Sequence, residues 1–507
     1  MVPILNAVLP DDLYTCDEVR ALDHFAIQQR GIPGIDLMER AGTAAFEALC
    51  QRWPGAHTLS VVCGSGNNGG DGYIVARLAL QQGWDVRAYP ASDPTLPGGD
   101  AHLACLRYRE AGGAMLDFMP EDFEGAEVLV DALLGTGLNR DVSDRHAAVI
   151  QAINRYRARR LNGRGVVAMD IPSGLNADTG AIMGHAVKAD LTVCFAGLKR
   201  GLLTGDGPEL AGDILFSTLG IDAFGSGSVR PSARRLTWPA NGLPHRSRSA
   251  HKGHHGHVLV IGGDSGYSGA ARLAGEAALR VGAGLVSVAT RATHAMVMNQ
   301  GRPELMCHAA ESAADLETLF GRASVIALGP GLGTQVWGRM MFQAALTSGL
   351  PLVVDADALN LLAEQPAQRR DWILTPHPGE AGRLLGSDSA TIQRDRFAAL
   401  SALQGRYGGT VVLKGTGSLI QHDTDLPLVC PLGNPGMASG GMGDVLTGVI
   451  AGLAAQKFGL PESAQLGVWL HAAAGDRAAA RNGERGLLAS DLLGPLHALA
   501  NAPDTVS

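Results

Sequence analysis

The sequence lacks an excess of positive charge and any long apolar run. Its 41 lysine and arginine residues are outnumbered by 49 aspartate and glutamate residues, which gives a formal net charge of -8 at pH 7. This balance disfavours nucleic acid or an anionic membrane surface as the main partner. No apolar stretch is long enough to span a bilayer, and the chain does not begin with the basic residues typical of a signal peptide. We therefore expect a cytoplasmic protein that binds neither nucleic acid nor membrane.

Paired cysteines and aromatic residues are also scarce. The seven cysteines are scattered without a C-x-x-C pair, which argues against both a disulfide framework and a zinc site. Aromatic residues make up 5% of the chain and charged residues 18%, whereas glycine occurs 68 times. An apolar, glycine-rich composition of this kind is typical of α/β proteins with many strand-to-helix loops.

Strand-like apolar runs alternate with helix-length amphipathic segments in two series. The first series extends from "TLSVVCG" to "ADLTVCFAG" and the second from "GHVLVIGG" to "TVVLKG". Such alternation predicts parallel sheets covered by helices on both faces. Between the series, residues 222–248 are rich in Gly, Ser, Pro and Arg and have no clear period. We predict two different three-layer α/β/α domains, at residues 1–222 and 248–507, joined by a linker at residues 223–247.

The segment "GSGNNGGDG", residues 64–72, follows an apolar strand and precedes a helical pattern. A glycine-rich turn at this place offers free backbone N–H groups to an anion. The segment matches neither G-x-G-x-x-G nor G-x-x-x-x-G-K-[ST], and no lysine follows that would meet a triphosphate. It therefore favours a single diphosphate within a larger ligand. The alternative is a tight turn whose Asn and Asp side chains bond their own backbone.

Two other predicted strand ends carry polar side chains. The run "LVDALLGTGLNRD" places Asp131 at the end of one strand, and "VVAMDIPSGLNADTG" places Asp170 and Ser173 at another. Oxygen atoms of Asn68, Asp131 and Ser173 together carry one formal negative charge, which suits a monovalent cation better than a divalent one. Asp170 then remains as an unpaired carboxylate that is available for proton transfer.

These segments, with the preceding "GIPGIDLMERAG", resemble the NAD(P)H-hydrate epimerase domain over nearly all of residues 10–220. The resemblance implies a Rossmann-like fold, a catalytic Asp170 at the epimerised ring carbon, and a potassium ion held by Asn68, Asp131 and Ser173. It also implies that the hydrated dinucleotide is bound by Asn67, Asn68, Gly69, Gly70, Asp71, Gly135, Thr136, Gly137, Leu138, Asn139, Arg140, Asp141 and Asp170.

The segment "GNPGMASGGMGDVLTGVIAGLAAQ", residues 433–456, carries the sharpest motif of the chain. Its glycines lead into an apolar helix with Asp444 in the first turn. Backbone amides of such a turn can face a transferring phosphoryl group, and the carboxylate can deprotonate a nearby hydroxyl. The alternative is an ordinary helix N-terminus with a favourable acidic residue.

This arrangement resembles the ribokinase fold. With "GYSGA", "TPHPGE" and "VVLKGTGSLI", it is similar to the ADP-dependent NAD(P)H-hydrate dehydratase over residues 248–500. The resemblance implies that Asp444 is the catalytic base, that ADP and Mg²⁺ are used, and that Glu380 orients the magnesium through water. Asp355 and Asp357 fit either magnesium ligands or a helix N-cap. The family implies two sets of contacts: Ala270, Gly333, His377 and Asp444 for the hydrated dinucleotide, and Lys414, Gly415, Thr416, Gly417, Ser418 and Gly443 for the adenine nucleotide.

Together the resemblances predict a bifunctional enzyme that is both an isomerase and a lyase. It would interconvert the R and S forms of hydrated NADH or NADPH (NADHX and NADPHX). It would then dehydrate the S form with ADP, giving NAD(P)H, AMP and phosphate. The family also implies a homo-oligomer. Two alternatives remain open: a ribokinase-type kinase for a small hydroxyl compound with an N-terminal regulatory domain, and an N-terminal domain that only binds a partner.

Overall fold

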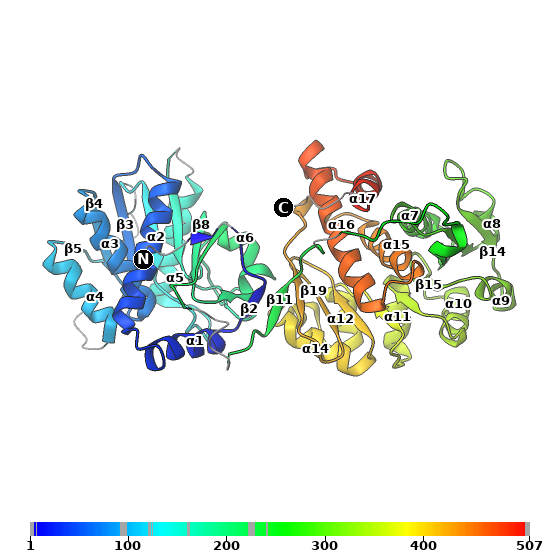
Figure 1. Cartoon of the computed structure of the whole chain (residues 1–507), viewed down its shortest axis with the longest axis horizontal. Helices are drawn as coiled ribbons and strands as arrows, with labels where there is room; N and C mark the ends of the chain where they lie inside the picture. Colours follow the sequence, from blue (N-terminus) through cyan, green and yellow to red (C-terminus); the bar gives the residue numbers. More distant parts are fainter. Residues whose placement is uncertain are drawn as a thin grey trace. The chain divides into compact units, whose positions relative to one another are not determined.

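The computed structural model describes residues 5–6, 8–91, 99–119, 123, 125–159, 163–221, 229–239 and 242–501. The chain forms two compact units, Met1–Arg234 and Arg235–Ser507 (Figure 1). Their division lies within the segment 223–247 that the sequence indicates as a linker. Of that segment, residues 223–228 and 240–241 lie outside the described residues.

The first unit is built on a sheet with the strand order β1-β10-β8-β7-β6-β3-β4-β5. All neighbouring strands are parallel except β1 and β10. Every residue of β6, β7 and β8 is buried, as expected for parallel strands covered on both faces. The strands are β1 (Leu5–Asn6), β3 (Thr58–Cys63), β4 (Asp85–Pro90), β5 (Ala114–Met115), β6 (Val128–Ala132), β7 (Gly165–Met169), β8 (Leu191–Phe195) and β10 (Asp213–Ser217). Two short strands of this unit, β2 (Asp12–Tyr14) and β9 (Leu198–Lys199), are not part of this sheet and pair with each other in parallel.

Helices cover both faces of this sheet. One apolar cluster joins the sheet to residues of the first four helices, and a second cluster joins its other face to α5. Helix α1 begins with a capping box, in which Thr15 and Glu18 bond each other's backbone N–H. The helices are α1 (Cys16–Gln28), α2 (Gly34–Arg52), α3 (Asn67–Gln81), α4 (Gly99–Glu110), α5 (Asp144–Ala158) and α6 (Gly207–Ala211), with the 3₁₀ turn η1 (Arg200–Leu203).

The second unit contains the strand order β14-β13-β12-β15-β16-β17-β18-β19-β20. The strands from β14 to β18 are parallel, and β18, β19 and β20 are antiparallel. Their bounds are β12 (His257–Ile261), β13 (Leu285–Thr290), β14 (Met306–Ala309), β15 (Val325–Leu328), β16 (Leu352–Val354), β17 (Trp372–Leu374), β18 (Thr410–Leu413), β19 (Ser418–His422) and β20 (Leu428–Cys430). A further strand, β11 (Ala233–Arg235), lies at the division between the units.

The second sheet also lies between two helical layers. Helices α7, α15, α16 and α17 share one apolar cluster with the sheet, while α10 packs on β15 and α14 packs on β18 and β19. The helices are α7 (Ser268–Arg280), α8 (Ala292–Ala295), α9 (Ala314–Phe320), α10 (Val336–Thr347), α11 (Ala356–Glu364), α12 (Pro378–Leu385), α13 (Ser389–Arg394), α14 (Arg396–Tyr407), α15 (Met442–Ala455), α16 (Leu460–Asn482) and α17 (Leu493–Leu499). The described residues of this unit also form the 3₁₀ turns η3 (Lys252–His255), η4 (Pro435–Met437) and η5 (Ala489–Leu492). The predicted fold class, two different layered α/β units, is confirmed.

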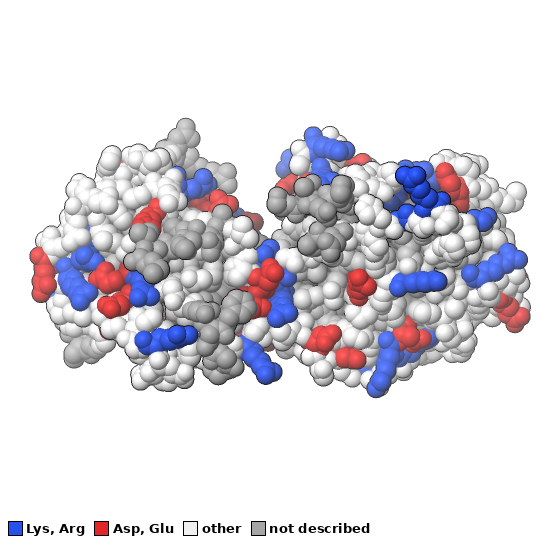
Figure 2. Space-filling model, in the orientation of Figure 1, with Lys and Arg blue, Asp and Glu red and all other residues white. Residues whose placement is uncertain are grey.

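The surface matches the charge balance of the sequence. Figure 2 shows lysine and arginine side chains interspersed with aspartate and glutamate over the displayed face of each unit. Among the helices of the described residues, none combines the length and the apolar character needed to cross a bilayer.

Candidate functional site

The first unit contains a cavity of about 640 Å³ beyond the carboxyl ends of its parallel strands. The start of α3, the loop after β6 and the ends of β7 and β8 line the cavity, together with residues of α1 and α2. A crevice at this edge of an open α/β sheet is the usual place for a ligand.

Most of the sequence-predicted substrate contacts line this cavity. They are Asn67, Asn68, Asp71, Gly135, Thr136, Gly137, Leu138, Asn139, Arg140 and Asp170. Gly69, Gly70 and Asp141 are not among the lining residues. Substrate contact stays a prediction for the lining residues and for these three alike.

The glycines of "GSGNNGGDG" serve mainly to pack α3 against its neighbours. A Cβ atom on Gly69 would lie 2.0 Å from the carbonyl oxygen of Gly64, and one on Gly70 would lie 2.5 Å from Met38 Sδ. Gly66 differs, since a Cβ there would meet no atom within 4 Å, and it lines the cavity. Close packing therefore explains much of the glycine content that the sequence suggested for anion binding.

Substituting Gly69 with alanine is expected to destabilise the first unit, because the clash is with backbone that cannot move away. Overpacking of this kind costs roughly 2–3 kcal/mol. Calorimetric unfolding of the full chain measures the effect, and Gly66→Ala is the matched control with open space at Cβ. Equal unfolding temperatures for the two variants would contradict the packing role.

The three predicted potassium ligands come together at the loop after β6. Asp131 and Ser173 are fully buried, and Asp131 accepts hydrogen bonds from Ser173 Oγ at 2.6 Å and Ser173 N at 2.8 Å. Asn68 Nδ2 donates to the carbonyl of Leu134 at 3.1 Å, and Ser173 Oγ lies 3.1 Å from the same oxygen. Burial raises the pKa of Asp131 to about 6, although bonds from Ser173 oppose the rise. The donor set is thus oxygen-rich with a single carboxylate, which fits a monovalent cation.

Asp170 lies directly after β7, where its φ of 64° is in the left-handed region that is strained for a non-glycine residue. Its Oδ1 atom forms an ion pair with Lys199 Nζ and accepts a hydrogen bond from Phe195 N at 3.1 Å. The expectation that Asp170 is unpaired is therefore wrong. Lys199 stands 29 residues later in β9 and is fully buried, so only the folded sheet reveals the pair.

Two further carboxyl groups line the same cavity near this pair. Burial, followed by the negative charge of Asp170, raises the pKa of Asp71 well above its usual value. Burial also raises the pKa of Asp23 to about 6, with the Lys199 charge opposing the shift. The cavity thus combines a buried ammonium with two carboxyl groups whose pKa values are raised, as is common where a site transfers protons. Sequence reasoning missed Asp23 and Lys199. A lysine inside the apolar run "LTVCFAGLKRGLL" was the available signal, because a buried lysine needs an acidic partner.

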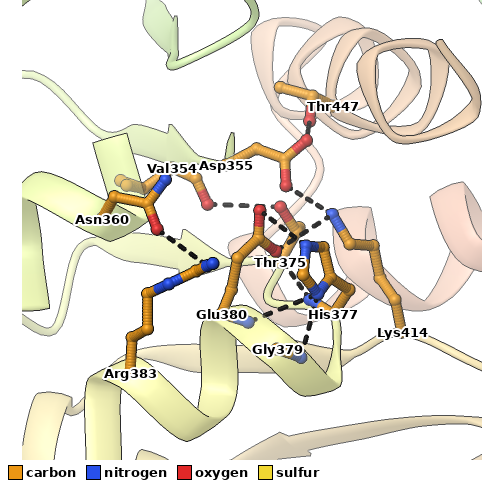
Figure 3. A network of polar contacts seen from close by, with 10 residues as sticks. All are labelled: Val354, Asp355, Asn360, Thr375, His377, Gly379, Glu380, Arg383, Lys414 and Thr447. Carbon is orange, nitrogen blue, oxygen red and sulfur yellow. Dashed lines mark hydrogen bonds and ion pairs between the residues drawn. The ribbon is translucent and has the colours of Figure 1, made fainter. Parts of the chain in front are cut away.

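The second unit gathers charged residues at the carboxyl ends of β16, β17 and β18 (Figure 3). Lys414 Nζ lies 2.5 Å from Asp355 Oδ1 and 3.7 Å from Glu380 Oε2, and Thr447 Oγ1 donates to Asp355 Oδ2 at 2.8 Å. Burial alone would raise the pKa of Asp355, but the Lys414 ammonium and hydrogen bonds lower it. Asp355 occupies the N-cap position of α11 without a side-chain capping bond, so its carboxylate serves this network instead.

Asp444 lies in the first turn of α15, next to this network. Burial, followed by the negative charge of Asp355, raises the pKa of Asp444 to about 7. A Cβ atom on the preceding Gly443 would lie 3.3 Å from both Asp355 Oδ2 and Lys414 Nζ, which places the start of α15 directly against the ion pair. A carboxylate with this pKa at a helix N-terminus is suited to act as a general base near neutral pH.

The rate of a reaction that uses Asp444 as base is expected to rise with pH. Its pKa is raised above the usual value, so the carboxyl group is protonated and inactive below about pH 7 and ionised above it. The kcat/KM of the second unit should therefore increase through about pH 7 and level off above it. A flat profile between about pH 5.5 and 8.5 would contradict the role of Asp444 as base.

The other predicted dinucleotide contacts of the second unit lie at helix starts and in a glycine turn. His377 caps α12: its Nδ1 accepts from Gly379 N at 3.0 Å, while half of its side chain stays exposed. Gly333 N donates to Asp357 Oδ2 at 2.8 Å, so this aspartate supports a glycine turn. Ala270 lies in the first turn of α7, and its Cβ would be 3.2 Å from a Cβ placed on Gly331. Contact of Ala270, Gly333 and His377 with substrate stays a prediction.

The predicted nucleotide loop, residues 414–418, is the turn between β18 and β19. Lys414 points back into the charge network, whereas Gly415 and Thr416 are exposed. For magnesium, the described residues hold no group of three His, Cys, Asp or Glu side chains able to bind a metal ion. Mg²⁺ that is carried by nucleotide phosphates and water needs only one or two carboxylates, and the buried Glu380 fits that lesser role.

Comparisons with known proteins found relatives for both units. Two family models match the chain: "YjeF-related protein N-terminus" at residues 34–201, and "NAD(P)H-hydrate dehydratase" at residues 258–496. The bifunctional NAD(P)H-hydrate repair enzyme Nnr of Coxiella burnetii is 49% identical over 493 residues, which cover 96% of this chain and 99% of that protein. The enzyme of the same name from Escherichia coli is 43% identical over 97% of this chain and 95% of that protein.

Among solved structures, an ADP/ATP-dependent NAD(P)H-hydrate dehydratase from Bacillus subtilis, co-crystallised with ATP/Mg²⁺, is 31% identical. The similarity covers 51% of this chain and 93% of that chain, with a TM-score of 0.48. The full-length relatives carry the assignment, because they match both units in one polypeptide. The chain belongs to the family of bifunctional NAD(P)H-hydrate repair enzymes.

Proposed function

We propose that this chain repairs hydrated NADH and NADPH in two steps. The first unit interconverts the R and S forms, and the second unit dehydrates the S form at the expense of ADP. The observation that carries the proposal is that each unit places a carboxyl group beside a lysine, Asp170 with Lys199 and Asp444 beside Lys414, in a chain related over its full length to repair enzymes.

In the first unit, the Asp170–Lys199 pair would move a proton on and off the hydroxyl group of the epimerised ring carbon. That carbon also bears the ring nitrogen, which can stabilise it while it is planar and allow the hydroxyl to return on the other face. Asn68, Asp131 and Ser173 would hold K⁺, whose charge would help to fix the diphosphate-linked substrate beside α3. Asn67 and Asn68 begin α3, where backbone N–H groups favour a phosphate.

In the second unit, Asp444 would remove the proton of the substrate hydroxyl. The hydroxyl oxygen would then bond to the terminal phosphorus of ADP, and AMP would leave. The ring nitrogen then expels the phosphate, and loss of a proton from the neighbouring ring carbon restores the reduced nicotinamide. Phosphate leaves far more readily than hydroxide, so the nucleotide makes the elimination possible. Backbone N–H groups at the start of α15 would stabilise the transferring phosphoryl group. Magnesium bound with the nucleotide would neutralise part of its charge, with Glu380 orienting its water.

Absorbance at 340 nm tests the proposal, since only reduced nicotinamide absorbs there. The purified chain is mixed with both NADPH-hydrate epimers, ADP, Mg²⁺ and K⁺, and complete recovery of absorbance is expected. Recovery of none, with folded protein and with either ADP or ATP, would refute the proposed function. The products also distinguish the kinase alternative, which full-length relatedness does not favour: a kinase leaves a stable phosphate ester, whereas the dehydratase releases inorganic phosphate.

A further inference from the structure

Arg396 is a buried cation at the start of α14. Its side chain has no exposed surface, and burial lowers the pKa of its guanidinium to about 10. The guanidinium donates to three backbone carbonyls of the turn between β18 and β19: Lys414 O, Leu413 O and Gly417 O, each at 3.3 Å. The guanidinium also donates from Nη1 to Gln393 Oε1 at 2.9 Å.

The turn wraps closely around this side chain. Gly415 has a φ of 134°, and a Cβ atom there would lie 2.5 Å from Arg396 Nη1. Any larger residue at this position would therefore collide with the guanidinium. Gly415 is thus needed both for the backbone conformation and for the close approach of Arg396.

The carbonyl groups that point inward to Arg396 determine the direction of the neighbouring N–H groups of the turn. Across a trans peptide, the C=O of one residue and the N–H of the next point in opposite directions. The N–H of Lys414, which follows the inward carbonyl of Leu413, duly reaches outward to Pro376 O at 2.9 Å. By the same rule, the inward carbonyl of Lys414 directs the N–H of the exposed Gly415 away from Arg396.

The outward N–H of Gly415, with the positive charge of Arg396 behind it, is a donor suited to an anion. We propose that Arg396 is a positioning residue for the adenine nucleotide, because it shapes the Lys414–Ser418 turn so that the backbone N–H of Gly415 meets a nucleotide phosphate. This inference rests on the proposed dehydratase function. Arg396 itself is fully buried and acts through the turn without touching the ligand.

Binding of ADP with Mg²⁺ to the full-length protein, measured by titration calorimetry, tests the inference. Arg396→Met keeps much of the side-chain volume but removes the charge and all the carbonyl contacts. We expect its ADP affinity to fall at least about tenfold. The KM for the hydrated dinucleotide should change less than about threefold, and epimerisation by the first unit should be unchanged. The contrast between the ADP affinity and the KM for the hydrated dinucleotide separates positioning of the nucleotide from general damage to the site.

Arg369 offers a matched control in the same unit. It also donates to two backbone carbonyls, Leu346 O at 2.8 Å and Leu350 O at 3.0 Å, but it precedes β17 and so lies at the opposite edge of the sheet. Arg369→Met should leave ADP affinity unchanged, and an equal loss in both variants would overturn the inference.

A second substitution covers the case in which Arg396→Met does not fold. Arg396→Lys keeps the charge, but its single ammonium cannot reproduce the planar fork that spans the turn. Lower ADP affinity in this variant supports the inference, and affinity equal to that of the unsubstituted protein in either folded variant overturns it. If the unsubstituted protein itself does not bind ADP, the proposed function fails and the inference fails with it.

Discussion

Replacing Asp444 with asparagine is expected to lower dehydration by at least about a thousandfold while epimerisation continues at its normal rate. A positioned general base contributes about 10²- to 10⁴-fold, and asparagine has nearly the same shape but no basic oxygen. The upper part of that range applies because Asp444 has a pKa of about 7 and lies beside the Lys414–Asp355 pair. The measurement is the initial rate of absorbance recovery at 340 nm from the S epimer with ADP.

The control for Asp444 addresses the simpler explanation that it only stabilises a helix N-terminus. Glu462 occupies the first turn of α16 and is exposed, so Glu462→Gln removes an acidic residue from a comparable position outside the charge network. This variant should keep full activity. If Asp444→Asn keeps more than about a tenth of the normal rate, Asp444 is a helix-stabilising residue and another group is the base.

The architecture was predictable because its signals are local. Buried parallel strands appear as short apolar runs, and most of these runs are followed by a helix. The carboxyl ends of these strands carry Asp131, Asp170 and the "TPHPGE" motif, and the folded sheets place them at their respective sites. Topology alone thus determines that residues far apart in sequence share an edge.

The partners of these residues could not be predicted, because pairing depends on side-chain distances that no spacing encodes. Lys199 neutralises Asp170, although a proton-transfer carboxylate was expected to be free. Lys414 was assigned to the nucleotide, yet it forms an ion pair with Asp355 at 2.5 Å. Arg396 carries no motif at all, and only its carbonyl contacts reveal its position under the turn.

The glycine segment of the first unit shows the limit of motif reasoning in another way. Five glycines near two asparagines suggested a ligand loop, and Gly66 and Asn67 do line the cavity. Gly69, however, is required because α3 approaches the backbone of Gly64 too closely for any side chain. One sequence pattern therefore combines residues required for packing with residues that line the cavity, and only atomic contacts distinguish the two.

Replacing Asp170 with asparagine is expected to stop epimerisation and to limit repair to the S fraction of the substrate mixture. Dehydration should continue at the normal rate, because Asp444 belongs to the other unit. The loss should exceed about a hundredfold, since asparagine cannot accept the substrate proton. The end point of absorbance at 340 nm measures this loss. Recovery should stop at the S fraction and resume when protein with an unsubstituted first unit is added.

Two variants show whether this loss reflects chemistry. Removing Asp170 leaves the buried Lys199 ammonium without its carboxylate, and breaking such a pair from one side costs roughly 3–5 kcal/mol. Asp170→Asn/Lys199→Met removes both charges, so it should fold better than the single variant yet stay inactive as an epimerase. Asp190→Asn is the matched control, because Asp190 pairs with Arg157 at 2.8 Å directly before β8, at the opposite edge of the same sheet. If the folded double variant epimerises normally, the Asp170–Lys199 pair only maintains the fold, and proton transfer must be assigned to Asp71 or Asp23.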